Sequence, residues 1–124
     1  SHADYLTTAD DEMCLVVQIE TKAGLDALDD ILTVDGVDAV FIGPSDLSAN
    51  LGHIGNPGAP EVVGAIDAAL DKIAASDKAS GIMALDPAAA KGYLARGVDF
   101  VAVSIDARTL ALGLRAIAAD MRAG

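Results

Sequence analysis

Two carboxylates stand where apolar runs of the chain stop. Glu20 follows the run 16–19, and Asp46 follows the run 40–42 after a Gly43-Pro44-Ser45 turn. If the runs are neighbouring parallel strands, both acids converge at the carboxyl-terminal edge of one sheet, where α/β folds place their chemistry. The acids lie about one βα repeat apart, as neighbouring strand ends require. An all-oxygen site with open positions suits Mg²⁺, Mn²⁺ or Co²⁺, whereas zinc favours His or Cys.

A purely structural role is the alternative for both acids. Each stands at the start of a predicted helix, where the helix dipole favours a negative charge. His2 and His53 are the only histidines, and neither falls at a predicted strand end. We interpret His53 as a loop-structuring residue. The two acids alone therefore leave a metal site and a structural role both open.

The turn around Asp46 also offers an anion site. The segment Gly43-Pro44-Ser45-Asp46-Leu47-Ser48 places free backbone N–H groups at a helix start, which suits a small carboxylate. A metal beside such a pocket is what a 2-keto acid needs. Its keto oxygen and one carboxylate oxygen would chelate the ion, and the metal would stabilise an enolate.

The remaining periodicity predicts four consecutive βα units. The expected strands are 14–19, 37–42, 81–84 and 98–104, and the expected helices are 22–32, 45–50, one from Pro60, 87–96 and one from Asp106. The helix from Pro60 carries an apolar stripe formed by Val62, Val63, Ile66, Leu70 and Ile73. Alternating strands and helices predict a parallel sheet with right-handed crossovers. The fold class is therefore α/β, with the content of half of a (βα)8 TIM barrel.

A half-barrel leaves the strands near Cys14 and Val98 as open edges. Such edges pair with another chain segment or aggregate. We therefore expect an amino-terminal half, a partner chain or a homodimer to close the barrel. Residues 1–13 read as a polar amino-terminal segment and 14–124 as the half-barrel domain.

Composition narrows the class of protein. The 124 residues are 52% hydrophobic, and 19 acidic against 8 basic residues give a net charge of −11. Phosphate backbones would be repelled, so we expect no nucleic-acid partner. No apolar run approaches the ~18 residues of a membrane span, so we expect no membrane partner. The single cysteine, Cys14, reads as a buried small hydrophobe, and a cytoplasmic location is the default expectation.

Three segments, 18–22, 34–48 and 51–57, resemble the HpcH/HpaI aldolase family, and the similarity runs from about Asp4 to the last helix. The resemblance implies a class II, metal-dependent aldolase on a (βα)8 barrel. Such enzymes cleave 4-hydroxy-2-keto acids to pyruvate and an aldehyde. Members act on 2,4-dihydroxyhept-2-ene-1,7-dioate, an open-chain acid of aromatic catabolism, or on sugar-derived keto acids. The expected cofactor is thus a divalent ion (Mg²⁺, Mn²⁺ or Co²⁺), and the expected partners are a 2-keto acid and an aldehyde.

The resemblance also implies roles for individual residues. Glu20 and Asp46 match the metal ligands, and the N–H groups of Ser45 and Asp46 match the site of the pyruvate carboxylate, with Gly43 and Pro44 shaping the turn. The family's catalytic His and Arg lie in its amino-terminal half, so no catalytic residue is assigned here. We expect the isolated chain to hold the metal weakly and to turn over little or nothing.

The resemblance further implies a hexamer in which the last helix packs against, or swaps with, a neighbouring subunit. An apolar stripe on that helix is compatible with this homo-oligomer and equally with an ordinary barrel helix; it consists of Leu110, Leu114, Ile117 and Met121.

Three other functions remain as alternatives. A Schiff-base aldolase needs a desolvated Lys at a strand end, and the nearest, Lys22, should be solvated at a helix start. A citrate-lyase-like C–C lyase would share the acidic pair. A catalytically inactive half-barrel acting only in assembly would need neither acid.

Overall fold

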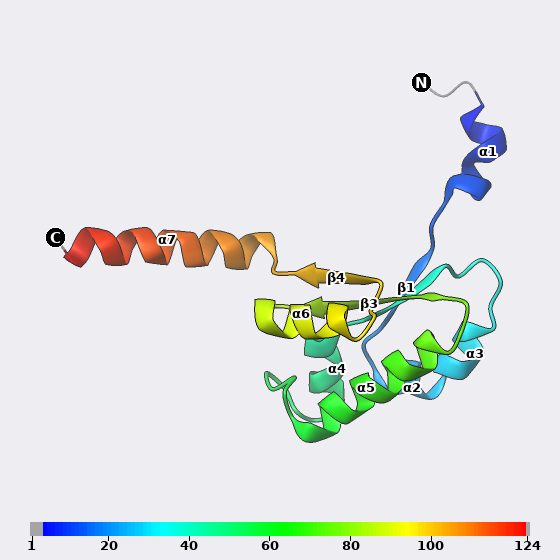
Figure 1. Cartoon of the computed structure of the whole chain (residues 1–124), viewed down its shortest axis with the longest axis horizontal. Helices are drawn as coiled ribbons and strands as arrows, with labels where there is room; N and C mark the ends of the chain where they lie inside the picture. Colours follow the sequence, from blue (N-terminus) through cyan, green and yellow to red (C-terminus); the bar gives the residue numbers. More distant parts are fainter. Residues whose placement is uncertain (1–3, 124) are drawn as a thin grey trace.

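The computed structural model describes residues 4–123 and contains a four-stranded parallel sheet. The strands lie side by side in chain order (Figure 1). They are β1 (Val16–Ile19), β2 (Ala39–Ile42), β3 (Ala79–Ala84) and β4 (Phe100–Val103). Each neighbouring pair is parallel and is joined through at least one helix. The prediction of four consecutive βα units is confirmed.

The helices begin where the chain supplies helix-starting residues. They are α1 (Tyr5–Glu12), α2 (Lys22–Asp26), α3 (Leu28–Leu32), α4 (Pro44–Asn50), α5 (Pro60–Ala74), α6 (Pro87–Ala95) and α7 (Asp106–Ala123). Proline occupies the first turn of α4, α5 and α6, where its missing N–H costs no hydrogen bond. Asp86 caps α6 by accepting a hydrogen bond from the Ala89 N–H at 2.9 Å, as its sequence position predicts.

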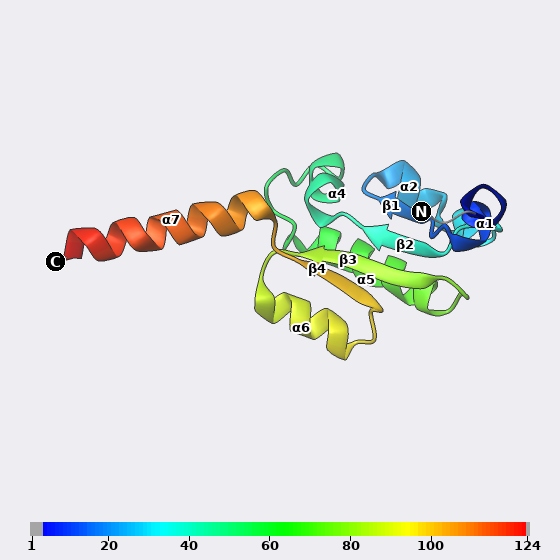
Figure 2. The ribbon, with the colours of Figure 1, turned by 90° about the horizontal axis from the view of Figure 1, so that it is seen from above.

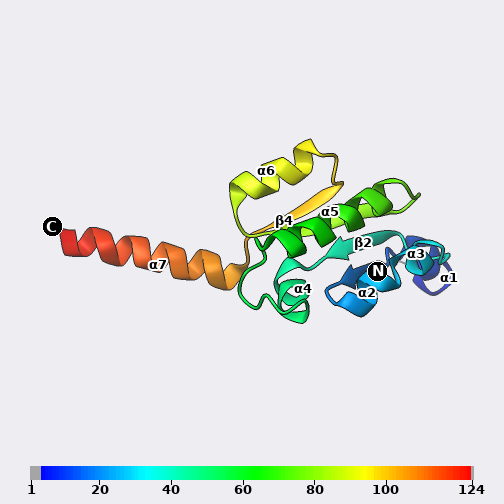
Figure 3. The ribbon, with the colours of Figure 1, turned by 90° about the horizontal axis from the view of Figure 1, so that it is seen from below.

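One face of the sheet carries the core. Helices α2 to α6 lie on this side, and α5 runs along the underside of the sheet (Figures 1 and 3). Alternate strand residues point toward these helices because side chains in a strand alternate between faces. The main core residues are Ile19, Val40, Ile42 and Ile82 from the strands and Val62, Ile66, Leu70 and Ile73 from α5.

The opposite face is open (Figure 2), and none of the helices of residues 4–123 crosses it in that view. Phe41 and Phe100 stack there with ring centroids 5.4 Å apart. Gly81 lies between them in the strand register, and a Cβ at Gly81 would come within 2.7 Å of both rings. In a (βα)8 barrel this face would line the interior, which layered side chains fill. Phe100 remains 41% exposed, so the described residues cover this face only in part.

Two aspartate carboxylates form hydrogen bonds between neighbouring strands at the amino-terminal end of the sheet, one between β1 and β2 and one between β3 and β4. Asp38 accepts a hydrogen bond from the Leu15 N–H at 2.7 Å. Asp99 accepts from the backbone N–H and the hydroxyl of Ser80 at 2.7 and 2.8 Å. These hydrogen bonds favour the ionised carboxylate, so the pKa of Asp99 is lowered from its usual value, first by the Ser80 N–H and then by its hydroxyl.

The predicted helix 22–32 is wrong as a single element. The structure divides it into α2 and α3 at Ala27, whose φ of −91° and ψ of 1° leave the helical region. The N–H of Ala27 bonds to Ala23 and Leu25 carbonyls, which tightens the turn. The chain then redirects so that Leu28 is almost fully buried under the sheet.

Three burial predictions are also wrong. Cys14 is exposed, because β1 begins only at Val16 and is an edge strand with one neighbour. For the same reason β1 is not fully buried: Val16 and Gln18 are exposed. In α5, Val63 is exposed while the rest of the predicted stripe is buried, because it lies at the margin of the apolar face.

The last helix, α7, projects away from the sheet in all three views (Figures 1, 2 and 3) and buries none of its residues. Its predicted apolar stripe, Leu110, Leu114, Ile117 and Met121, is exposed along its whole length. Among the described residues, no helix is both long and apolar enough to cross a bilayer.

Candidate metal and keto-acid site

The register of β1 and β2 brings the two predicted ligands to one rim. Ile19 pairs with Ile42 at the end of the ladder, and the Gly43 N–H donates to the Ile19 carbonyl at 3.0 Å. Glu20 is the next residue after β1, and Asp46 lies in the first turn of α4 directly after β2. Both acids therefore stand at the carboxyl-terminal edge of neighbouring strands, where the sequence places them.

Glycine at position 43 leaves space for the side chains of Gln18 and Glu20. A Cβ at Gly43 would lie 3.3 Å from Oε2 of Glu20 and 2.7 Å from Nε2 of Gln18. Its φ of −104° is open to any residue, so the reason for glycine is the close approach and not the backbone conformation. The missing side chain leaves the Glu20 carboxylate lying against the backbone that leads to Asp46.

Neither acid is engaged as a helix cap by its side chain. Thr21, not Glu20, caps α2, since its Oγ1 accepts from the Gly24 N–H at 3.0 Å. Helix α4 begins at Pro44, and its N-cap residue, Gly43, has no side chain to cap it. Within residues 4–123, Asp46 makes no hydrogen bond or ion pair through its carboxylate. The helix dipole is therefore the only support that remains for a purely structural role of the two acids. Both carboxylates have oxygens available to bind a cation.

A hollow of about 230 Å³ opens beside Asp46 and Gln18, and Glu20 is not among the residues that line it. Its polar side consists of Gln18, Ser45 and Asp46, and its apolar wall includes Phe41, Met83 and Ile105. Within residues 4–123, no third carboxylate, histidine or cysteine joins the two acids into a larger ligand cluster. The donors are oxygens only, which fits a hard divalent cation completed by water or substrate oxygens. The space could hold a small keto acid against the Gly43-Pro44-Ser45 turn.

Sequence reasoning missed Gln18. Its Nε2 donates to Oε2 of Glu20 at 2.8 Å and so orients the carboxylate. Hydrogen-bonded carboxylates are the rule around metals, because the outer partner fixes the ligand's direction. A signal existed in the sequence: Gln18 is a polar residue in an apolar strand, two positions from Glu20 and therefore on the same face.

The strand end of β4 was also missed. Ser104 has a φ of 74°, the one non-glycine residue in the left-handed region among those described. That conformation costs energy for a residue with a Cβ and tends to occur at functional sites. It turns the chain so that Ile105 lines the hollow before α7 departs. No sequence pattern predicts the turn at Ser104.

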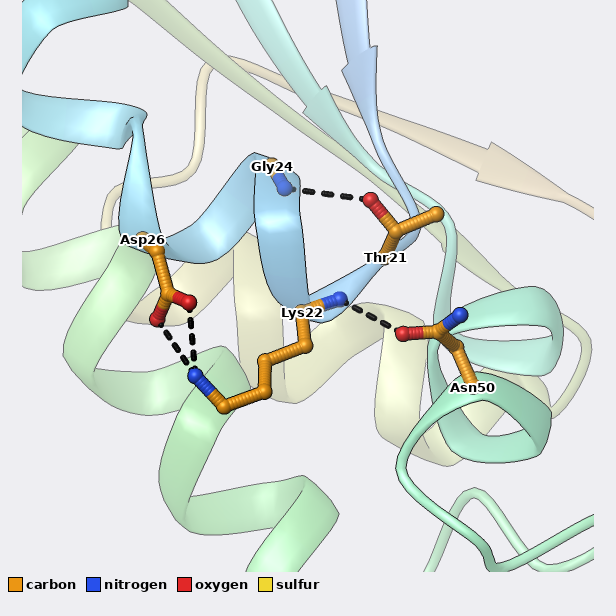
Figure 4. A network of polar contacts seen from close by, with 5 residues as sticks. All are labelled: Thr21, Lys22, Gly24, Asp26 and Asn50. Atoms are coloured by element: carbon orange, nitrogen blue, oxygen red, sulfur yellow. Dashed lines mark hydrogen bonds and ion pairs between the residues drawn. The ribbon is translucent and has the colours of Figure 1, made fainter.

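The other predicted residues lie outside the hollow. The exposed Lys22 ammonium pairs with Asp26 at 2.6 Å, which does not match the desolvated amine of a Schiff-base enzyme (Figure 4). His53 lies in the loop after α4, and its Nε2 is 2.9 Å from the Glu61 carboxylate of α5, consistent with a loop-structuring role. His2 lies outside the described residues.

Comparison with known proteins decides the family. A model of the HpcH/HpaI aldolase/citrate lyase family matches residues 2–112. The chain belongs to this family. It is 51% identical over 119 residues to a hydroxypyruvate/pyruvate aldolase of Roseovarius nubinhibens, covering 96% of this chain and 46% of that protein. It is also 53% identical over 116 residues to a 4-hydroxy-2-oxo-heptane-1,7-dioate aldolase of Salmonella paratyphi B, covering 94% and 44%.

The fold comparison agrees. A crystal structure of a HpcH/HpaI aldolase/citrate lyase family protein from Burkholderia cenocepacia superposes with a TM-score of 0.90 at 37% identity, covering 97% of this chain and 47% of that one. The chain therefore spans about half the length of the relatives it matches. Its four βα units correspond to the carboxyl-terminal half of an aldolase barrel.

Proposed function

We propose that this chain supplies the metal- and keto-acid-binding half of a class II aldolase active site. The reaction would be the reversible cleavage of a 4-hydroxy-2-keto acid to pyruvate and an aldehyde. The observation that carries the proposal is the pair Glu20 and Asp46, which end neighbouring strands beside a glycine with no side chain and cap no helix. The names of the relatives support the same reaction class.

The chain's own residues would bind and orient the substrate. Glu20 and Asp46 would hold a divalent ion, which acts as a Lewis acid toward the keto oxygen and lowers the energy of the pyruvate enolate. The backbone N–H groups of Ser45 and Asp46 would receive the substrate carboxylate, with Pro44 fixing the first helical position. The apolar wall at Phe41 and the residues across the hollow would limit the access of water.

Proton transfer would come from elsewhere. Cleavage breaks the C3–C4 bond of the keto acid, removes a proton from the C4 hydroxyl and returns one to C3 of pyruvate. His53 is engaged with Glu61 and does not line the hollow, so it is not placed for this role. In the family resemblance a His of the amino-terminal half assists proton transfer and an Arg of that half binds the keto oxygen. We propose that such a half completes the barrel.

Assembly forms part of the same proposal. The stripe Leu110, Leu114, Ile117 and Met121 is exposed, and two edge strands stand open. Exposed apolar surface of this kind marks an interaction site. We propose that α7 packs on a second copy of the protein, as the resemblance implies.

Metal binding by the 124-residue chain tests the proposal most directly. A titration followed by Mn²⁺ electron paramagnetic resonance should reveal one site, and Glu20→Gln or Asp46→Asn should weaken it by at least about tenfold. Asp29→Asn is the matched control, because this exposed carboxylate pairs with Lys72 away from the site. A chain that binds no Mn²⁺, or loses equal affinity in the control, would contradict the proposed site.

Pyruvate release from a 4-hydroxy-2-keto acid, with Mn²⁺ added, tests the division between halves. The chain alone should release little or none. Turnover by the chain alone would show that the second half is dispensable. Borohydride trapping with pyruvate should give no covalent adduct, and an adduct would instead support a Schiff-base enzyme.

A further inference from the structure

Asn50 connects two segments that the sequence keeps far apart. It is the last residue of α4, and its Oδ1 accepts a hydrogen bond from the backbone N–H of Lys22 at 2.7 Å, 28 residues away (Figure 4). Lys22 is the first residue of α2, and its N–H has no partner within that helix. The side chain of Asn50 thus bridges the starting turn of α2 and the end of α4.

This hydrogen bond is not needed to start α2. Thr21 already caps the helix through the Gly24 N–H at 3.0 Å, and the Lys22 side chain is engaged with Asp26 (Figure 4). The bond from Asn50 is therefore a link between elements added to a helix that is capped without it. It depends only on the amide oxygen of Asn50, since its donor is backbone.

Two hydrogen bonds, one on each side of the carboxylates, join the segment of Glu20 to the segment of Asp46. On one side, the Gly43 N–H bonds to the Ile19 carbonyl at 3.0 Å, immediately before Glu20. On the other side, the Asn50 bond falls two residues after Glu20. The same two bonds fall before and after Asp46 on its own segment. Each acid thus stands on a short segment that is tied to the other segment at both ends.

The placement of Asn50 on α4 completes the argument. Asp46 and Asn50 are four residues apart in one helix, so they lie one above the other on the same face. A shift of α4 away from α2 would break the Asn50 bond and carry Asp46 away from Glu20. A metal held by two carboxylates on separate segments is sensitive to this separation, because the ion needs both ligands within its fixed coordination distance.

We propose that Asn50 is a positioning residue that sets the separation of Glu20 and Asp46 for metal binding. This inference rests on the proposed metal site. Asn50 acts through the two segments and does not itself contact the metal or the substrate. Loss of the Asn50 side chain should lower the Mn²⁺ affinity clearly and the melting temperature only slightly.

The test is a Mn²⁺ titration of the 124-residue chain with three variants, each also melted by circular dichroism. Asn50→Ala removes the acceptor and should weaken Mn²⁺ binding by about tenfold. This is the lower end of the effect of removing a direct hydrogen-bond partner of a metal ligand, because Asn50 acts on the ligands only through their segments. Asn50→Asp keeps an acceptor oxygen of the same reach and should bind Mn²⁺ at least as tightly as the unaltered chain. Asn56→Ala, at an exposed loop asparagine, is the matched control and should change neither quantity.

The outcomes separate the two proposals. If the unaltered chain binds Mn²⁺ and Asn50→Ala binds it equally well, the positioning role is overturned and the metal site stands. A lower melting temperature without a change in affinity indicates a merely structural residue, which also overturns it. Should Asn50→Ala fail to fold, Asn50→Asp decides, because weak binding in that folded variant contradicts the role. A chain that binds no Mn²⁺ at all defeats the metal site and this inference together.

Discussion

Replacing Gly43 by Ala tests the geometry of the site through a single added methyl group. That Cβ would stand 2.7 Å from Nε2 of Gln18 and 3.3 Å from Oε2 of Glu20. Ordinary contacts begin near ~3.5 Å, so the Gln18 amide must retreat by about 0.8 Å. The backbone does not resist the change, because φ is −104°. The obstacle is the flexible end of a side chain, so we expect only a small loss of fold stability.

The larger effect should fall on metal binding. A retreat of about 0.8 Å is enough to break the 2.8 Å hydrogen bond from Gln18 to Glu20, since hydrogen bonds of this type end near ~3.2 Å. Hydrogen bonds to charged groups contribute about 1.5–3 kcal/mol, and partial exposure places this one near the lower limit. Since about 1.4 kcal/mol corresponds to a tenfold change in affinity, Gly43→Ala should raise the Mn²⁺ dissociation constant about tenfold.

The assay is the Mn²⁺ titration, with thermal unfolding measured on the same samples. Gly64→Ala is the control, because a Cβ at this position in α5 meets no atom within 4 Å. It should leave Mn²⁺ affinity unchanged and raise stability by up to about 1 kcal/mol, the gain of Ala over Gly in a helix. If Gly43→Ala binds Mn²⁺ as tightly as the unaltered chain, the close approach at Gly43 does not organise the site.

Two further predictions concern the sheet and the last helix. The pKa of Asp99 is lowered by its hydrogen bonds from Ser80, so the ionised carboxylate stabilises the fold above its unfolded pKa and this contribution disappears as the pH falls through the lower, folded value. Asp99→Asn should therefore lower the melting temperature at pH 7, with the difference shrinking as the pH drops below 4; a gap independent of pH would refute this. Leu114→Lys should shift the chain toward a monomer in light scattering at unchanged helix content, because Leu114 is 58% exposed and buries nothing within the chain. An unaltered chain that is already monomeric would refute the proposed packing of α7.

The order of the elements was predictable because the local signals agreed with one another. Apolar runs without polar alternation indicate strands buried between layers. Pro44, Pro60 and Pro87 each stand at a helix start in the structure, as their positions predict. The position of strand-end acids then follows from topology alone, so the sequence was enough to place Glu20 and Asp46 at one rim of the sheet.

The failures arose where the answer depends on contacts distant in sequence. Cys14 sits in an apolar run but is exposed, because it precedes β1 at the edge of the sheet. The break at Ala27 follows from the direction in which Leu28 must point to reach the core. The Asn50 link joins residues 28 positions apart and has no local pattern. Such features are set by tertiary packing, which overrides local propensity.

The site and the uncovered surfaces occupy different parts of the molecule. Every polar group placed at the site, from Gln18 to Asn50, belongs to the first two βα units. The third and fourth units contribute mainly apolar wall, through Met83 and Ile105, and end in the uncovered α7. Metal affinity should therefore depend on hydrogen bonds among β1, β2, α2 and α4. Enclosure of the bound substrate should depend on what covers the open face and α7, so binding of the ion and exclusion of water are separable functions of this fold.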